Sequence, residues 1–266
     1  MKKRIWKESA AFLAATFGVT WLFWFGAYFN DAPASARLIM LGTAAPSVMG
    51  IFFTVGFGGK PELQALFRSA LHYKAPRIGW VYATLLFPVV LLCACAVFAV
   101  TGGILPSAQF PLWFLPLAFF YIFICMGPLG EELGWRGFLL KRFLPEWGVI
   151  KSGLIVGLIW SAWHLPLFLM PDGIQNELAK MGLGIAVSGY FLYTTCISLL
   201  MSVLYDRTDG NLLLCMIFHT VCNLSLGVAP LILIESGGAI LLMILLFTTV
   251  FILRKTVGKR LQSESF

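Results

Sequence analysis

Charged side chains are scarce in this sequence: only 12% of its 266 residues are Asp, Glu, Lys or Arg, whereas a soluble domain carries roughly 25%. Hydrophobic residues make up a further 59%. A soluble globular domain is therefore excluded, because so few charges cannot cover its surface. The composition predicts an integral membrane protein.

Cysteine is absent from the polar connections, so the sequence offers no disulfide framework of the kind found in small secreted domains. All six cysteines fall inside apolar runs, at Cys93, Cys95, Cys125, Cys196, Cys215 and Cys222. The Cys93-x-Cys95 pair has no partner Cys or His pair at zinc spacing. We therefore expect these thiols to serve only in packing.

The basic residues form no continuous stripe, so the net charge of +7 does not indicate nucleic acid binding. They lie at the ends and in the connections of hydrophobic segments. With the N-terminus inside the cell, seventeen basic residues fall on the cytoplasmic side and two, Arg37 and Lys180, outside. This bias predicts cytoplasmic termini and an even number of spans. We expect the protein to lie in the plasma membrane.

Windows of about 20 apolar residues predict an all-α polytopic protein with about eight transmembrane helices. The predicted spans are 9–29, 37–57, 79–101, 111–129, 150–169, 183–204, 211–228 and 237–253. The first is too long and too aromatic for the core of a signal peptide, so we expect it to remain uncleaved. No repeat of fixed period is present, and residues 1–266 are expected to form a single membrane domain.

The segment 61–73 has apolar residues on one helical face and polar residues on the other. This pattern predicts either a short helix on the cytoplasmic membrane surface or a solvated linker.

Three short polar clusters interrupt the apolar chain. A charged side chain at the centre of a membrane helix costs at least ~2.5 to 3.5 kcal/mol unless it is paired, so these clusters mark an expected intramembrane polar site. The first is Glu131-Glu132-x-x-x-Arg136, and it follows Gly127-Pro128. Proline predicts a kink there, or the start of a new helix.

Within this cluster, Glu132 and Arg136 are four residues apart, so they can pair on one helical face. Glu131 points about 100 degrees away from Glu132 and has no local cation. Either both glutamates cap the N-terminus of a cytoplasmic helix, where acidic residues are favoured, or Glu131 is a poorly solvated general base.

The other two clusters are Trp160-x-x-x-His164 and His219-x-x-x-Asn223. His219 and Asn223 project from one helical face, and two polar groups there need partners. Counting along straight helices places Glu131 at the cytoplasmic edge, His164 in the external half and His219 near the middle. Kinked or re-entrant helices around a cavity would bring these side chains to one depth.

The order of these clusters resembles that of the CAAX-protease and bacteriocin-processing (CPBP) family of intramembrane endopeptidases, which are related to type II CAAX prenyl endopeptidases. The family pattern is Glu-Glu-x-x-x-Arg, then Phe-x-x-x-His, then His-x-x-x-Asn or Asp. In this sequence Trp160 stands in the position of the family's Phe. The resemblance covers roughly residues 128–226, and each motif alone is weakly specific.

The resemblance implies four catalytic residues, which are Glu131, His164, His219 and Asn223. It implies supporting roles for Glu132, Arg136 and Trp160. Without a metal, Glu131 and His164 would activate water, and His219 and Asn223 would stabilise the oxyanion. In a zinc version, Glu131, His164 and His219 would be the ligands. The metal-free version is favoured because Glu132 is already matched to Arg136 and the sequence has no His-Glu-x-x-His.

We therefore expect an intramembrane endopeptidase that cleaves a hydrophobic, lipidated or membrane-associated peptide or protein. Its partners would be that substrate and the lipid bilayer. An ion-coupled transporter remains an alternative, although no pair of repeats supports it. So does a non-catalytic immunity or partner protein. Polar contacts between membrane helices average only ~0.6 kcal/mol, so a purely structural role explains four polar groups poorly.

Overall fold

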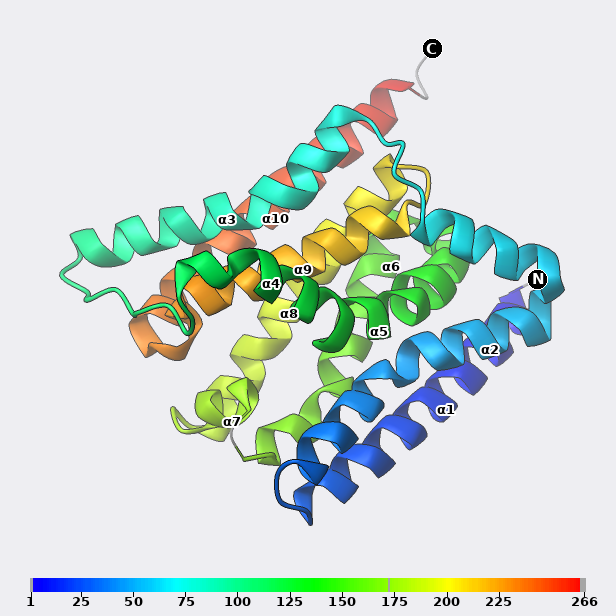
Figure 1. The fold of residues 1–266 in the computed structure, drawn as a ribbon. Helices are drawn as coiled ribbons and strands as arrows, with labels where there is room; N and C mark the ends of the chain where they lie inside the picture. The colour runs from blue at the N-terminus through cyan, green and yellow to red at the C-terminus, as the bar shows by residue number, and fades with distance from the viewer. Residues whose placement is uncertain (1, 172, 264–266) are drawn as a thin grey trace.

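The structure, a computed structural model, describes residues 2–171 and 173–263, with side chains for 4–171 and 173–257. The side chains of Lys2, Lys3, Lys259 and Arg260, which the cytoplasmic charge count includes, lie outside the described residues. Figure 1 shows the helical bundle. Its α-helices are α1 (Lys2–Tyr28), α2 (Ala34–Ala70), α3 (Arg77–Val100), α4 (Leu115–Cys125), α5 (Pro128–Gly134), α6 (Lys141–Trp163), α7 (Ile174–Ala179), α8 (Leu183–Arg207), α9 (Leu212–Val228) and α10 (Glu235–Ser263).

Four short segments of other helix types connect these elements. Three are 3₁₀ helices, η1 (Leu112–Phe114), η3 (Leu165–Leu169) and η4 (Leu231–Leu233), and the fourth is a π-helix, η2 (Trp135–Leu140). The described residues contain no strand. The all-α fold expected from the sequence is therefore confirmed.

Every predicted span coincides with a helical segment, but the count of eight spans is not confirmed. Within the described residues, six helical stretches are long and apolar enough to cross a membrane. Two of the predicted spans correspond to shorter apolar helices, Leu112–Cys125 and Leu212–Val228. The second of these is α9, which carries His219 and Asn223.

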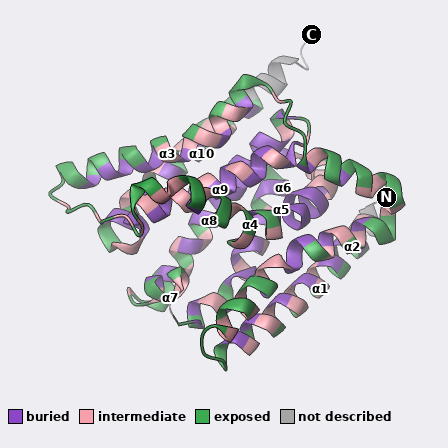
Figure 2. Ribbon diagram, viewed as in Figure 1, coloured by how far each residue is buried: buried purple, intermediate pink, exposed green. Residues whose placement is uncertain are grey.

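Buried residues concentrate in the centre of the bundle, on α5, α6, α8 and α9, whereas green exposed residues dominate the outer faces of α1, α3 and α10 (Figure 2). Many exposed residues are large and apolar, such as Phe52, Leu92 and Phe247. Apolar outer faces are what lipid tails require of a membrane protein. Polar side chains are thereby directed to the interior, where α5 lies between α2 and α9.

Close backbone contact holds the short helix α5 against α2. A Cβ atom on Gly134 would lie 2.1 Å from the Pro46 carbonyl oxygen, and one on Gly50 would lie 2.8 Å from the Gly134 Cα. Ser47 also donates a hydrogen bond of 2.8 Å to the carbonyl of Leu129. Small residues therefore let α2 cover the helix that carries both glutamates.

Helices α6 and α8 also approach closely through small residues. A Cβ atom on Gly157 would lie 2.9 Å from the Thr195 Cα, and one on Gly153 would lie 2.8 Å from the Ser202 hydroxyl oxygen. The Ser198 hydroxyl donates to the carbonyl of Gly153 at 3.0 Å. This packing fixes the far end of α6, where Trp160 and His164 lie.

The chain breaks where the sequence predicts a kink. Gly127 has φ +116°, which favours glycine, and α5 begins at Pro128 directly after it. The chain also breaks at two places that were not predicted as kinks, Gly59 within α2 and Gly148 within α6. The residues after Gly59 stay helical to Ala70. Helical structure is therefore confirmed for residues 61–70 but not for 71–73, and the position of the segment at the membrane surface stays a prediction.

Candidate active site

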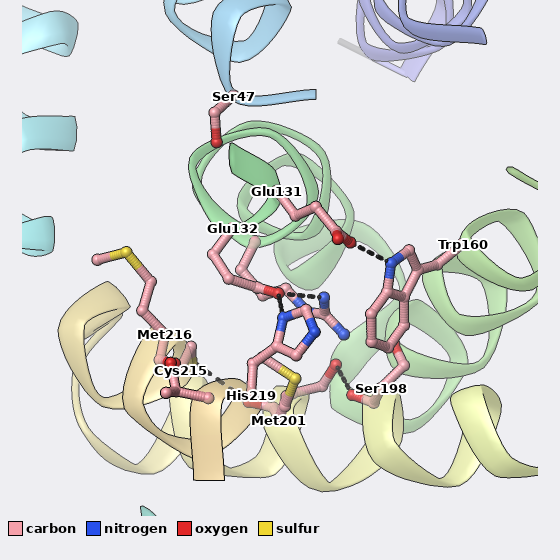
Figure 3. A network of polar contacts seen from close by, with 12 residues as sticks. Ser47, Glu131, Glu132, Trp160, Ser198, Met201, Cys215, Met216 and His219 are labelled. Atoms are coloured by element: carbon pink, nitrogen blue, oxygen red, sulfur yellow. Dashed lines mark hydrogen bonds and ion pairs between the residues drawn. The ribbon is translucent and has the colours of Figure 1, made fainter. Parts of the chain in front are cut away.

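Both glutamates lie on α5, and their side chains leave it in different directions (Figure 3). Glu131 is 4% exposed and Glu132 is completely buried. The residues that follow adopt the π-helix η2, a rare conformation that often occurs at functional sites. The predicted new helix after Gly127-Pro128 therefore exists, but a π-helical turn separates its first segment from α6.

Glu132 forms a buried network with two cations or potential cations. Its Oε1 accepts a hydrogen bond of 2.9 Å from Nη1 of Arg136 and lies 2.8 Å from Nδ1 of His219. Arg136 is completely buried, and its guanidinium lies 4.5 Å from the ring centroid of Trp160. The pairing of Glu132 with Arg136 is confirmed. His219 shares the same oxygen, a contact that was not predicted from the sequence.

Glu131 is held by an indole instead of a cation. The Nε1–H of Trp160 donates a hydrogen bond of 2.6 Å to Oε2 of Glu131. Among the described residues, Oε1 of Glu131 has no hydrogen-bond partner, and it would lie 2.4 Å from a Cβ atom on Gly127. The carboxylate therefore has one oxygen fixed and one oxygen available to a ligand.

His164 directly follows α6 as its C-cap residue, and its tautomer follows from its backbone contact. Its Nδ1 lies 2.7 Å from the carbonyl oxygen of Trp160, which can only accept, so Nδ1 carries the proton and Nε2 of the neutral ring has the lone pair. The ring packs against Trp163, with centroids 4.6 Å apart, and against Tyr190, 5.3 Å away. His164 retains 7% exposure.

The structure thus brings Glu131, Trp160, His164 and His219 into one cluster, although straight-helix counting placed them at different depths. The Trp160 ring lies 5.6 Å from His164 and 5.2 Å from His219 between centroids. Asn223 makes no hydrogen bond with the described residues of this cluster. It lies one turn beyond His219 on α9, half-buried and without a hydrogen-bond partner among the described residues.

Two neighbours of the cluster were not recognised as site residues from the sequence. Gly127 was noted only as a kink, yet its missing side chain makes room for Oε1 of Glu131. Tyr190 makes an edge-on contact with His164 and accepts a hydrogen bond of 3.0 Å from Gln175. Glycine before proline gave a signal for the first residue, but nothing distinguished Tyr190 from the other tyrosines of the apolar helix α8.

The donor atoms fit a zinc site only in part. Both histidines direct Nδ1 to an oxygen atom, as metal-bound histidines commonly do, so their Nε2 atoms remain for another contact. Within the described part of the chain, however, no group of three or more His, Cys, Asp or Glu side chains is placed to hold a metal ion. The two histidines among the three expected ligands thus have the Nδ1 contact typical of zinc ligands. The described side chains of Glu131, His164 and His219 are not close enough together to hold one metal ion.

Comparisons with known proteins agree with the motifs. A family profile described as "Type II CAAX prenyl endopeptidase Rce1-like" matches residues 112–225, a range that contains all three polar clusters. The chain is also 25% identical to the CAAX prenyl protease 2 of Methanococcus maripaludis, over 80% of this chain and 82% of that protein. The chain is therefore similar to Rce1-like CAAX prenyl endopeptidases in the region that carries the three ordered motifs, and to one CAAX prenyl protease over most of its length.

Proposed function

We propose that this protein hydrolyses a peptide bond of a hydrophobic, lipidated or membrane-associated peptide or protein by attack of a water molecule that Glu131 activates. The observation that carries the proposal is the environment of Glu131. It is buried, one oxygen is fixed by Trp160, and the other has no hydrogen-bond partner among the described residues. A general base needs such a free oxygen within reach of the proton it accepts.

In the proposed reaction, Oε1 of Glu131 takes a proton from water while the hydroxide oxygen bonds to the peptide carbonyl carbon. His164 orients that water by accepting its second hydrogen at Nε2, the nitrogen that the contact with Trp160 leaves unprotonated. The C–N bond then breaks, and the proton held by Glu131 passes to the leaving amine. A positioned general base contributes about 10²- to 10⁴-fold to such a rate.

His219 and Asn223 are proposed to stabilise the oxyanion, at ~2.7 to 4 kcal/mol for each donor. Because Nδ1 of His219 faces the carboxylate of Glu132, Nε2 can donate only when both ring nitrogens carry protons. With both glutamates ionised, a protonated His219 and Arg136 bring the net charge of the cluster to zero. Glu132 and Arg136 thus support the charge that His219 needs in this role.

The relative from Methanococcus maripaludis is named a CAAX prenyl protease. We infer from this name that a lipidated peptide is a substrate of this chain as well. A quenched fluorescent peptide, supplied with and without a prenyl group to purified protein in proteoliposomes, tests both parts of the proposal. Cleavage that Glu131→Ala and His164→Ala abolish, at unchanged expression, is the expected result. Full activity of either variant would show that the site assignment is wrong.

Metal dependence is tested on the same preparation. Elemental analysis by inductively coupled plasma mass spectrometry measures zinc per protein, and cleavage is followed after chelator treatment. We expect activity to survive the chelator. Stoichiometric zinc, with activity lost to chelator and restored by zinc, would overturn the metal-free mechanism.

A transporter is the second candidate, since four polar groups inside a bundle could also pass protons. Flux measurements in the same proteoliposomes distinguish the two functions directly. We expect peptide cleavage without a proton or cation flux that depends on Glu131.

A further inference from the structure

We infer that Trp160 is a positioning residue whose indole N–H sets the orientation of the Glu131 carboxylate, a role that the phenylalanine of the family pattern cannot perform. The inference rests on the proposed function for its effect on catalysis. Its structural part, the hydrogen bond between the two side chains, can be tested without any activity.

Trp160 contacts four polar residues around it. Its Nε1–H donates to Glu131 at 2.6 Å, and its carbonyl accepts from Nδ1 of His164 at 2.7 Å. The guanidinium of Arg136 lies 4.5 Å from its ring centroid, and the ring of His219 lies 5.2 Å away. The side chain is 3% exposed, so little water competes for these contacts.

Only one of these contacts depends on the identity of the aromatic residue. The carbonyl belongs to the backbone, and a phenylalanine ring could still contact Arg136 and His219. The N–H group is specific to tryptophan in this comparison. Replacing Phe by Trp at this position therefore preserves the packing and adds a charge-assisted hydrogen bond, which is roughly twice as strong as one between neutral groups.

This hydrogen bond fixes the role of each carboxylate oxygen. With Oε2 held by Trp160, rotation about the last side-chain bond of Glu131 is restricted, and Oε1 is directed to the side where Gly127 leaves space. A Cβ atom at Gly127 would lie 3.7 Å from Cε1 of His219, so this space is next to the His219 ring. The base and the proposed oxyanion donor thus face one small volume.

Trp135 provides a matched control. It is also completely buried, but its Nε1 has no hydrogen-bond partner among the described residues. Its ring packs on Phe12 and Trp163. Replacing Trp135 by Phe removes the same atoms from a comparable environment without removing a hydrogen bond to the carboxylate.

The test compares Trp160→Phe with Trp135→Phe in proteoliposomes, using the peptide of the cleavage assay. We expect Trp160→Phe to lower kcat by about 10- to 100-fold with little change in KM, because a small misplacement of a catalytic group costs up to 10² in rate. Trp135→Phe should leave kcat near that of the unaltered protein. Equal losses in both variants would show that only the bulk of tryptophan matters.

Infrared difference spectroscopy tests the contact independently of catalysis. The carboxylate stretching band that Glu131→Gln removes belongs to Glu131, and it should shift in Trp160→Phe but not in Trp135→Phe. An unshifted band would overturn the inference even if the protein is an active protease. If the unaltered protein cleaves nothing while the band shifts as expected, the proposed function fails and the positioning contact stands.

Discussion

Glu131 and Glu132 are neighbours on the short helix α5, but their carboxylates lie in two regions of different character. The sealed region consists of Glu132, Arg136 and His219, and its salt bridge is completely buried. The open region consists of Glu131, Trp160 and His164, where neutral groups make the contacts and Oε1 of Glu131 has no hydrogen-bond partner among the described residues. One motif therefore supplies a charge-neutralised support and a partly free carboxylate side by side.

The difference suggests how a membrane bundle could hold Glu131 as the proposed general base. A cation paired directly with Glu131 would occupy the oxygen that accepts a proton in the proposed reaction. An indole N–H orients the same group with one hydrogen bond and leaves the second oxygen free. In the sealed region, by contrast, the buried charges of Glu132 and Arg136 pair with each other. Three atoms of this pair have no hydrogen-bond partner among the described residues: Oε2 of Glu132 and Nε and Nη2 of Arg136.

The largest expected effect separates the two glutamates by catalysis. Glu131→Gln keeps the size of the side chain and an oxygen for the Trp160 hydrogen bond, but it removes the base. We expect peptide cleavage to fall by about 10²- to 10⁴-fold, with the unfolding temperature in detergent almost unchanged. A variant that retained cleavage, or that lost it only by unfolding, would contradict the division into two regions.

The next effect appears in stability. Arg136→Met leaves Glu132 in a completely buried site without its arginine. Removal of one partner of a buried ion pair costs about 3 to 5 kcal/mol, so the free energy of unfolding, measured by denaturant titration in micelles, should fall by this order. Combining Glu132→Gln with Arg136→Met should restore part of the loss, because no buried carboxylate is then left without its arginine.

A double variant no more stable than Arg136→Met would show that His219 alone already compensates Glu132. The same titration on Glu131→Gln serves as the reference for the open region. There we expect no comparable loss, since Trp160 is neutral.

The sequence predicted the helices and the residues of both regions better than the contacts between residues that lie far apart in the chain. Hydrophobic length located the long apolar helices, although not the short helix α7. The spacing of Glu132 and Arg136 predicted their pair, and both signals are local. The contact of His219 with Glu132 joins residues 87 positions apart, and no local spacing encodes it. Straight-helix counting likewise failed for depth, because the break at Gly127 and the π-helix η2 move α5 relative to a regular helix.

The contact of Trp160 with Glu131 was also not predicted from the sequence, which gave Trp160 only a supporting role. The two residues are 29 positions apart in the chain, yet the indole nitrogen lies 2.6 Å from the carboxylate.

A smaller effect is expected at Gly127, which borders the open region. Alanine there would adopt φ +116° and place Cβ 2.4 Å from Oε1 of Glu131. Backbone strain of this kind costs of order 1 to 3 kcal/mol, and the carboxylate must also move. We expect Gly127→Ala to lower cleavage more than its loss of stability explains, as measured by activity at temperatures where the variant remains folded. Equal losses would place Gly127 among purely structural residues.

The smallest effect should act on both regions equally. The hydroxyl of Ser47 donates to the carbonyl of Leu129 at 2.8 Å and ties the start of α5 to α2. Ser47→Ala removes one hydrogen bond to the part of α5 that precedes both glutamates. The loss of one hydrogen bond lowers the free energy of unfolding by about 0.5 to 1.5 kcal/mol. Added to Glu131→Gln or to Arg136→Met, it should lower the unfolding free energy by the same amount in each background. Unequal increments would mean that α5 does not support the two regions as one rigid unit.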